Sequence, residues 1–505
     1  MREHEQQDRQ QTRSEHPRDA RHSGQSEPPI EVDGAGLTLA DLDKVARGSG
    51  ARLAPGVLDR LRRQYREARE ISTRQSVYGQ STGVGANRFV EVDEHDDEHG
   101  LRLLRSHAAD AGPHVPEETV RVMLAIRLSQ LAASGSGISP DVVQGLERML
   151  RDDALPRVGT MGGIGTADLA ALASTALALA GERPTTNPWP TPVSFGKDSA
   201  LPFMSSSALT LARAARAVTR LRDLERSSRI VAALSATAVG ANRQAFSPQA
   251  GRAAVVPPAA RVAEEMRGLL QEEAEPARIQ DPFGLRAYIQ SQGAVVDAMD
   301  RLRCLVESLT ATAQENPLFD FESQSAVHHG GFHQVSLGLA IDGLDLALAQ
   351  SAPLVVSRIT MLHDPAYTGA PSFLADGTDG SSGHMMLEYI AASAMAQLRN
   401  AAQPASLNTV VLSQGAEEDA SFATQAAEQL DRAVDSYQTL LSMELLSAHR
   451  AISVLGRATS SSLHRAVARL REALPIVAAD HDLRPDIDAA GHVLPGLARG
   501  ILPEP

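Results

Sequence analysis

The chain has 505 residues, so it can bury a large core, and only 3% of them are aromatic, which in an alanine- and leucine-rich chain favours helix over sheet. Its formal net charge of −14 argues against general binding to nucleic acid or to an anionic membrane surface. The single cysteine, Cys304, excludes a disulfide bond within the chain and fits a reducing cytoplasm, where we expect the protein to reside. No apolar run looks long enough to span a bilayer.

Residues 1–36 are predicted to form a disordered N-terminal tail. The segment 1–29 is rich in arginine, glutamine, histidine and glutamate and has no hydrophobic centre, so we do not expect a signal peptide. Ordered structure is expected from Leu37, where Thr38 can cap a short helix. A second helical stretch is expected over 55–71.

The rest of the chain is dominated by helical patterns, and little of it alternates with the period of a strand. Apolar residues recur at helical spacing over 120–133, and 167–181 is apolar nearly all round, which predicts a buried helix. The longest helical runs lie at 206–226, 284–314, 334–360, 383–402 and 417–455, and a shorter one at 462–474. We therefore expect an elongated, mainly α protein with an N-terminal domain over 37–205 and a long-helix bundle with C-terminal helices over 206–505.

Short motifs are spread along this helical framework. A glycine-rich loop, Tyr-Gly-Gln-Ser-Thr-Gly-Val-Gly, begins at Tyr78, and a second glycine-rich stretch at 159–168 leads directly into a helix. Further motifs are Leu-Arg-Ser-His-Ala at 104–108, Gln-Asp-Pro-Phe-Gly-Leu-Arg at 280–286, Glu-Asn-Pro-Leu at 315–318, Gly-Phe-His at 331–333, Ser-Gly-His-Met at 382–385, Pro-Ala-Ser at 404–406 and Glu-Glu at 417–418.

These motifs, in this order, resemble those of the aromatic amino acid ammonia-lyases, which act on histidine, phenylalanine or tyrosine. The loop at 78–85 is similar to the family's Tyr-Gly-Val-Asn-Thr-Gly-Phe-Gly, and 280–286 is similar to its Gln-Asp-Pro-Tyr-Ser-Leu-Arg. The resemblance covers about 37–470. It implies a homotetramer whose long helices form a shared central core, with active sites assembled from three subunits. Helix N-termini that point into such sites suit an anionic small-molecule substrate.

The resemblance also implies roles for single residues. Tyr78 matches the family's general base, although a phenol with an ordinary pKa near ~10 needs nearby cations or helix termini to act at neutral pH. Arg286 matches the arginine that binds the substrate carboxylate, a task for which a guanidinium fork is suited. Gln280 would be a polar residue of the same site. From the residues alone, a core tyrosine and a surface salt bridge remain alternatives for Tyr78 and Arg286.

Four further residues match positions that line the family's substrate pocket. His107 and Glu417 would contact the substrate side chain, and because histidine lyases carry glutamate where the phenylalanine and tyrosine lyases usually carry glutamine, Glu417 hints at an imidazole or another polar substrate. Glu417 also reads as the acidic first turn of a helix. Phe332 and Met385 would be apolar pocket walls, or ordinary core.

A cluster of three histidines also stands out in the sequence. His328, His329 and His333 lie close together, but no Asp or Cys completes a familiar metal-binding spacing, so no metal site is expected.

The residues that should form the family's electrophile are altered. In the family, an Ala-Ser-Gly triplet before Asp-Leu-Ala cyclises and dehydrates into a methylidene-imidazolone (MIO) ring; here the triplet is Gly165-Thr166-Ala167. Ring closure needs the amide nitrogen of the third residue to attack the carbonyl of the first, and the Cβ of Ala167 adds bulk there. Thr166 could give only a methyl-substituted alkene. Phe283 lacks the family's tyrosine hydroxyl, and Ser205 replaces an asparagine, so we expect neither MIO nor another cofactor.

Three functions are compatible with this pattern. The first is an MIO-independent enzyme in which Tyr78 moves a proton and Arg286 holds a carboxylate, for elimination, cyclisation or isomerisation of an amino-acid-like substrate. Ergothionase-like members without MIO, which eliminate a quaternary ammonium group, offer a precedent. The second is a conventional ammonia-lyase with an atypical electrophile built from Thr166. The third is a non-catalytic homologue that binds a ligand or a partner subunit.

Overall fold

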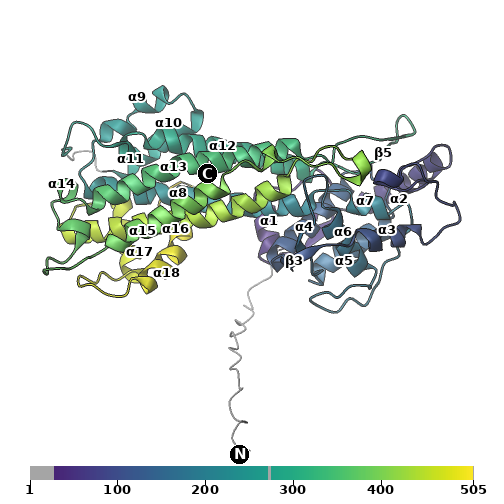
Figure 1. The fold of residues 1–505 in the computed structure, drawn as a ribbon, viewed down its shortest axis with the longest axis horizontal. Coiled ribbons are helices and arrows are strands. Elements are labelled where there is room, and N and C mark those ends of the chain that lie inside the picture. The colour runs from purple at the N-terminus through teal and green to yellow at the C-terminus, as the bar shows by residue number, and fades with distance from the viewer. Residues whose placement is uncertain (1–27, 271–274, 504–505) are drawn as a thin grey trace, which may run out of the picture.

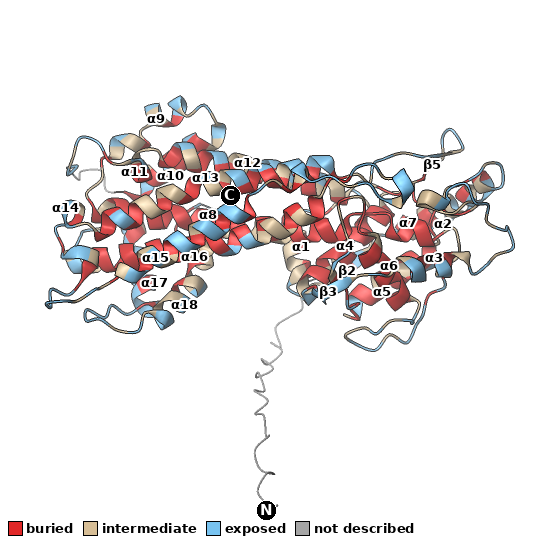
Figure 2. Cartoon of the chain, in the orientation of Figure 1, coloured by how far each residue is buried: buried red, intermediate tan, exposed pale blue. Residues whose placement is uncertain are grey.

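A computed structural model of the protein describes residues 28–270 and 275–503. The molecule is elongated, and it consists of a bundle of long helices with a smaller, loop-rich unit at one end (Figure 1). It is mainly helical, and the described strands form three sheets of two strands each. The buried residues run continuously through both parts, as Figure 2 shows. The predicted mainly α fold class is therefore confirmed.

The smaller unit contains the N-terminal elements. Its helix α4 is buried on all sides, because nearly every residue from Thr119 to Ala132 is enclosed. The helices are α1 (Leu39–Ala46), α2 (Val57–Ser72), α3 (His99–His107), α4 (Glu117–Ala132), α5 (Pro140–Arg151), α6 (Leu169–Leu179) and α7 (Ala200–Met204). The strands are β1 (Ile30–Val32), β2 (Ala51–Leu53), β3 (Ala111–His114) and β4 (Gly159–Met161), with β1 parallel to β2 and β3 antiparallel to β4.

The long-helix bundle follows. Its main members are α8 (Ala208–Ala238), α12 (Tyr288–Thr310), α13 (Val335–His363), α15 (Met385–Ala401) and α16 (Ala423–Leu455), whose many alanines allow close helix packing. Shorter helices cover its far end: α9 (Pro248–Ala253), α10 (Pro257–Leu269), α11 (Phe283–Arg286), α14 (Pro365–Thr368), α17 (Ser461–Ala473) and α18 (Arg484–Val493). The third sheet pairs β5 (Leu318–Asp320) with β6 (Ser325–Val327) near the smaller unit.

The start of the ordered chain differs from the sequence-based expectation. Residues 30–32 form β1, so the tail predicted for 1–36 does not extend over this strand, while its first part, 1–27, lies outside the described residues. Thr38 does cap α1: its side chain accepts the Asp41 N–H, and the Asp41 side chain accepts the Thr38 N–H.

Three helix boundaries also differ. The α8 helix continues to Ala238, well beyond the expected end at residue 226. The run expected over 284–314 is divided at Ala287, which separates α11 from α12. The α16 helix begins only at Ala423, so Glu417 lies in the loop before the helix and not in its first turn.

The α13 helix is long and apolar enough, by length and composition, to cross a membrane, so the expectation that no apolar run has this length is wrong. However, it packs against α12, α15 and α16, and it buries the polar side chains Asp342, Asp345 and Arg358. The α13 helix therefore belongs to the core of the bundle.

The buried carboxyl group of Asp345 predicts that the stability of this bundle depends on pH. Both of its carboxylate oxygens are buried without a hydrogen-bond partner among the described residues, and burial, assisted by Asp342, raises its pKa well above the ordinary value. Because the folded-state pKa is raised, stability should fall as pH rises from the ordinary aspartate pKa through the folded pKa. We expect Asp345→Asn to remove this dependence and to raise the melting temperature at pH 8 by at least about 2 °C.

The matched control is Asp342→Asn, measured by thermal unfolding at one fixed protein concentration. The Asp342 oxygens accept the Ala405 and Ser406 N–H groups at 3.1 and 3.0 Å, so this change should destabilise the protein. A lower melting temperature for Asp345→Asn across the whole pH range would contradict the prediction.

Candidate functional site

The loop after α2 folds around the side chain of Tyr78. The Tyr78 hydroxyl accepts a hydrogen bond from the Gly85 N–H at 2.6 Å, and the Tyr78 N–H donates to His328 Nε2 at 3.2 Å. Gly79 has a φ of +75°, and a Cβ there would lie 2.3 Å from Leu201 Cδ2. The glycines of this loop thus let the backbone curl tightly enough to enclose the phenol.

The surroundings of Tyr78 within one chain favour the neutral phenol. Burial raises the pKa of Tyr78 above its ordinary value, and the Glu417 carboxylate raises it further. The Gly85 N–H and the Arg88 guanidinium act in the opposite direction but do not outweigh burial. To act as a base near neutral pH, Tyr78 therefore needs positive charge beyond what its own chain provides.

The loop that carries Glu417 docks on the tyrosine loop. Leu412 and Glu417 exchange backbone hydrogen bonds of 2.8 and 3.3 Å, which close a tight turn. Ser413 Oγ, at the start of this turn, accepts the Ala86 N–H at 2.9 Å. This contact joins the two loops and explains why the charge of Glu417 acts on Tyr78. The structure thus brings together two predicted site residues that are more than 300 positions apart.

The altered triplet forms a strained turn next to these loops. Gly165 and Ala167 have φ angles of +83° and +78°, in the left-handed region that suits glycine. The Gly165 carbonyl accepts hydrogen bonds from Ser421 Oγ at 2.7 Å and from the Gln334 N–H at 3.2 Å. The Phe422 N–H donates to the Ile164 carbonyl at 2.8 Å. Contacts from the starts of α13 and α16 therefore hold the turn.

The space around Gly165 excludes a side chain. A Cβ at this position would lie 2.1 Å from Ser421 Oγ and 2.7 Å from the Ala423 nitrogen. The alanine that the family carries here therefore does not fit this backbone.

Thr166 pairs directly with His333 in an isolated antiparallel bridge. Residues opposite each other in such a bridge place their side chains on the same face, with Cβ atoms about 5 Å apart. His333 Nε2 lies 3.8 Å from Asp419 Oδ2. The half-buried Thr166 therefore has an imidazole and a carboxylate beside it. Phe332, also half-buried, directly precedes His333 in the chain.

The histidine cluster supports the backbone. His328 Nε2 accepts the Tyr78 N–H, as noted above. His329 Nε2 donates to the Glu315 carbonyl at 2.7 Å, and its Nδ1 accepts the Gly331 N–H at 2.9 Å. Within the described part of the chain, no group of three or more His, Cys, Asp or Glu side chains is arranged to hold a metal ion.

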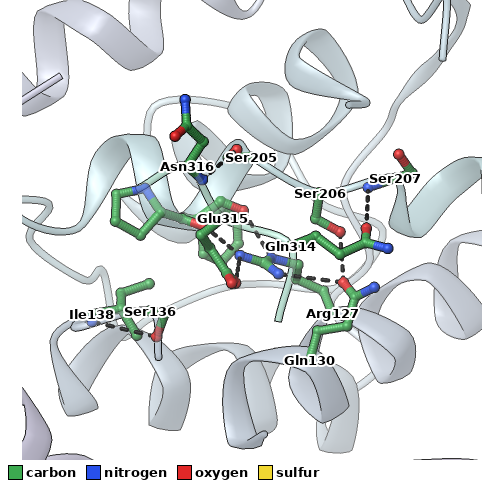
Figure 3. Close-up of polar contacts among 12 residues, drawn as sticks. Arg127, Gln130, Ser136, Ile138, Ser205, Ser206, Ser207, Gln314, Glu315 and Asn316 are labelled. Atoms are coloured by element: carbon green, nitrogen blue, oxygen red, sulfur yellow. Dashed lines mark hydrogen bonds and ion pairs between the residues drawn. The ribbon is translucent and has the colours of Figure 1, made fainter. Parts of the chain in front are cut away.

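A buried polar network surrounds Arg127 (Figure 3). The fully buried Arg127 donates to Glu315 Oε1 at 2.7 Å, to the Phe203 carbonyl at 2.9 Å, and to the Pro202 carbonyl. Ser205 is 5% exposed, and its Oγ accepts the Asn316 N–H at 3.3 Å. The carbonyl of Ser206 accepts a hydrogen bond from the Asp168 N–H at 2.7 Å. This network links the end of α7 to the start of α6.

The remaining predicted site residues are divided between the two ends of the molecule. His107 ends α3, in the smaller unit, and its Nδ1 donates to the Leu103 carbonyl at 2.8 Å. Phe283 and Arg286 are on α11, at the end of the bundle opposite α2, α3 and α6 (Figure 1). Gln280 is exposed just before α11, and Met385 is the first residue of α15. One chain therefore does not place Arg286 near Tyr78.

On α11, Arg286 and Phe283 contact each other. The guanidinium carbon lies 4.4 Å from the centroid of the Phe283 ring, and Phe283 is 61% exposed. The aromatic ring thus orients the cation towards the surface of the chain.

Sequence reasoning missed the residues that hold the site loops. Ser413, Ser421 and Gln334 act on backbone groups across long sequence separations, and nothing in the local pattern marks them. Asp168 had a weak signal, because it directly precedes a helix; its oxygens accept the Thr210 N–H and hydroxyl, both at 2.8 Å.

Comparisons with known proteins agree with this architecture. The sequence model of the aromatic amino acid lyase family matches residues 37–472. The histidine ammonia-lyase of Deinococcus radiodurans is 29% identical over 475 residues, which cover 89% of this chain and 91% of that protein.

Two solved structures with this fold are also informative. Ergothionase from Treponema denticola, an ergothioneine-degrading enzyme solved with desmethyl-ergothioneine sulfonic acid, superposes with a TM-score of 0.87 at 23% identity and covers 93% of this chain and 99% of its own. Tyrosine aminomutase from Streptomyces globisporus superposes with a TM-score of 0.86 at 24% identity, over 93% and 97% of the two chains.

The contact between the two loops predicts a measurable shift. Glu417→Gln removes a negative charge that raises the pKa of Tyr78, so the phenol should ionise at lower pH than in the unaltered protein. The measurement is an ultraviolet titration, with Tyr78 isolated as the difference between each protein and its Tyr78→Phe counterpart.

Glu418→Gln is the matched control, since it removes the same charge from the adjacent, exposed position. It should shift the titration less. Equal shifts in both variants would show that Glu417 acts only through the general charge of the loop.

Proposed function

The chain belongs to the aromatic amino acid lyase family, and we propose that it is a lyase-type enzyme that works without MIO. Its histidine ammonia-lyase relatives support lyase chemistry on a small amino-acid-like substrate. The proposal rests on one observation, the environment of the Gly165-Thr166-Ala167 turn. Gly165 has no room for the family's alanine, and Ala167 carries a Cβ at a φ of +78° where the family has glycine.

The side chains of the triplet do not fit the MIO group. The exocyclic methylidene requires a serine hydroxymethyl group, and Thr166 would leave an additional methyl on the alkene. This methyl adds bulk and lowers the electrophilicity of the alkene. We therefore derive the reaction from the other residues of the site.

The proposed reaction is an elimination promoted by Tyr78. The phenolate takes a proton from the carbon next to the one that bears the leaving group, and the C–H electron pair becomes the new double bond. The leaving group departs with its bonding pair. A quaternary ammonium group leaves as a neutral tertiary amine, so it needs neither an added proton nor an electrophile. The ergothionase neighbour supports this choice of leaving group. Cyclisation or isomerisation of a substrate with an acidified proton uses the same base.

Arg286 is proposed to bind the substrate carboxylate from a second copy of the chain. Tyr78 and α11 lie at opposite ends of one chain, so the complete site requires association of subunits (Figure 1). The exposed apolar side chains of Val335, Leu339 and Leu346, at 41%, 56% and 50%, lie along α13 and offer a surface for it. We propose a homotetramer with composite sites, in which Arg286 also supplies positive charge to the Tyr78 phenol.

A second candidate function is the conventional ammonia-lyase with an atypical electrophile. The observation in its favour is the pair of donors, Ser421 Oγ and the Gln334 N–H, on the Gly165 carbonyl. Two hydrogen bonds polarise a carbonyl towards attack by a nucleophile such as the amide nitrogen of Ala167. The mass of the triplet distinguishes this candidate from the first.

We expect the purified protein to have its unmodified mass across the triplet, by intact mass measurement and peptide mapping of 157–175. Because the turn is already held in place, Thr166→Ser combined with Ala167→Gly should lose two water molecules at this site and gain a near-ultraviolet absorbance. The control, Thr166→Val with Ala167→Gly, has the same backbone freedom but no hydroxyl to eliminate. A loss of two waters in the unaltered protein would instead support the conventional lyase.

The catalytic roles are tested by turnover of L-histidine and of ergothioneine, followed as the acrylate product and the released amine. We expect release of the tertiary amine from ergothioneine, and a loss of kcat on the order of 100-fold or more in Tyr78→Phe. Arg286→Gln should mainly raise KM, because it removes the carboxylate partner.

Tyr65→Phe is the control for loss of a phenol. The Tyr65 hydroxyl donates to Asp198 Oδ2 at 2.7 Å, outside the candidate site, so activity should be retained. Neither turnover nor binding of amino-acid-like ligands by the intact assembly would favour the non-catalytic homologue.

A further inference from the structure

The helix that carries Arg286 is too short to be stable without contacts to the rest of the protein. The α11 helix has four residues, Phe283–Arg286, fewer than an isolated helix needs to be stable. Arg286 Nε is buried without a hydrogen-bond partner among the described residues, so side-chain hydrogen bonds at this atom do not set its direction. The orientation of Arg286 therefore depends on the ring of Phe283 and on the backbone of α11.

The backbone of α11 is held by a buried arginine of α13. Arg358 Nη1 donates to the Gly284 carbonyl at 2.9 Å, from a side chain that is 2% exposed. The α11 and α13 helices are in close contact at Gly284. A Cβ added to Gly284 would lie only 2.9 Å from Ser357 Oγ and 3.1 Å from Arg358 Cγ. The anchor point is thus two residues from Arg286.

Arg358 is itself fixed on its other side. Its Nε and Nη2 donate to the two oxygens of Glu444 at 2.6 and 2.7 Å, and Glu444 is fully buried on α16. Ser235 Oγ of α8 donates to the same carboxylate at 2.7 Å. The Arg358 guanidinium carbon also lies 5.2 Å from the ring centroid of Tyr288, the first residue of α12. Four long helices thus determine where this guanidinium points.

We propose that Arg358, held by Glu444, is a positioning residue for Arg286. This inference rests on the proposed role of Arg286 in carboxylate binding. By clamping Gly284, Arg358 transmits the rigid geometry of the bundle to α11, so that Arg286 meets a carboxylate in a bidentate orientation. Arg358 itself has no direct contact with substrate in this scheme.

The chain contains a matched pair at its other end. Arg127 and Glu315 are both fully buried, and Arg127 likewise combines a carboxylate with backbone carbonyls, those of Pro202 and Phe203. The Arg127–Glu315 pair, shown in Figure 3, supports α7. A substitution in either pair disturbs an equally buried ion pair, but each pair holds a different half of the composite site.

The test compares Arg358→Lys with Arg127→Lys in the intact assembly. A lysine keeps the charge but cannot bind the carboxylate in bidentate fashion and the Gly284 carbonyl at the same time. Peptide-level hydrogen exchange should increase over 283–288 in Arg358→Lys and over 200–206 in Arg127→Lys, each with little change in the other segment. Gly284→Ala is the second variant, since its Cβ pushes α11 from α13 while the ion pair stays intact.

The functional readout is the binding of urocanate, the acrylate that loss of ammonia from histidine would leave, and of its methyl ester. In Arg358→Lys and Gly284→Ala we expect the affinity for urocanate to fall on the order of tenfold, while the affinity for the uncharged ester changes little. Arg127→Lys should keep the preference for the acid. Loss of both ligands to the same degree in all three variants would indicate a general loss of structure and overturn the inference.

The exchange measurement decides the inference independently of the ligand. Unchanged exchange over 283–288 in Gly284→Ala and Arg358→Lys overturns it. If neither urocanate nor its ester binds the unaltered protein, the proposed substrate class fails, while increased exchange confined to 283–288 still supports the positioning role. The unaltered protein could prefer urocanate to its ester while Arg286→Gln keeps this preference. That result would contradict the proposed role of Arg286 in carboxylate binding, but it would not contradict the positioning of α11 by Arg358.

Discussion

The length and close packing of the central helices constrain everything else in this protein. With 33 residues, α16 is roughly 50 Å long at the usual rise of an α-helix, and α8 and α13 run beside it with 31 and 29 residues. The alanine-rich contacts between them leave little freedom to bend. The tyrosine loop and α11 are therefore held at opposite ends of a rigid body. A site that uses both must be formed between chains, and its geometry then depends on how firmly each half is fixed to the bundle.

Two buried arginine–glutamate pairs fix those halves. Burying such a pair has a large desolvation cost, and a well-packed apolar replacement is often as stable. Arg127 and Arg358 each combine a carboxylate with backbone carbonyls of an element that would otherwise have little to hold it, α7 in one case and α11 in the other. Their contribution is therefore best understood as orientation of short, functionally placed segments. This view connects the polar interior of the bundle to the chemistry that we propose for its ends.

The sequence was sufficient for the fold and for the identity of several motifs, because long amphipathic and alanine-rich runs report helices directly. It was insufficient wherever a distant contact overrides the local pattern. The acidic segment from Glu417 reads as a helix start, yet Phe422 adopts a φ of +50° and its N–H bonds to Ile164, so the helix begins later. In the same way, the Ser413 hydroxyl brings Glu417 to the tyrosine loop by accepting a single hydrogen bond from the Ala86 N–H, which no periodicity encodes.

The triplet turn shows that backbone geometry and side-chain chemistry can change separately. Ala167 keeps a left-handed conformation that costs a β-carbon-bearing residue on the order of 1 kcal/mol, although its Cβ is at odds with ring closure. Such strain persists because Ser421, Gln334 and Phe422 together determine the path of the chain. The same path sets Thr166 opposite His333, with Asp419 beyond it. The turn is therefore a rigid support that places polar groups beside Thr166, and this geometry follows from the surrounding contacts and not from the chemistry of the triplet.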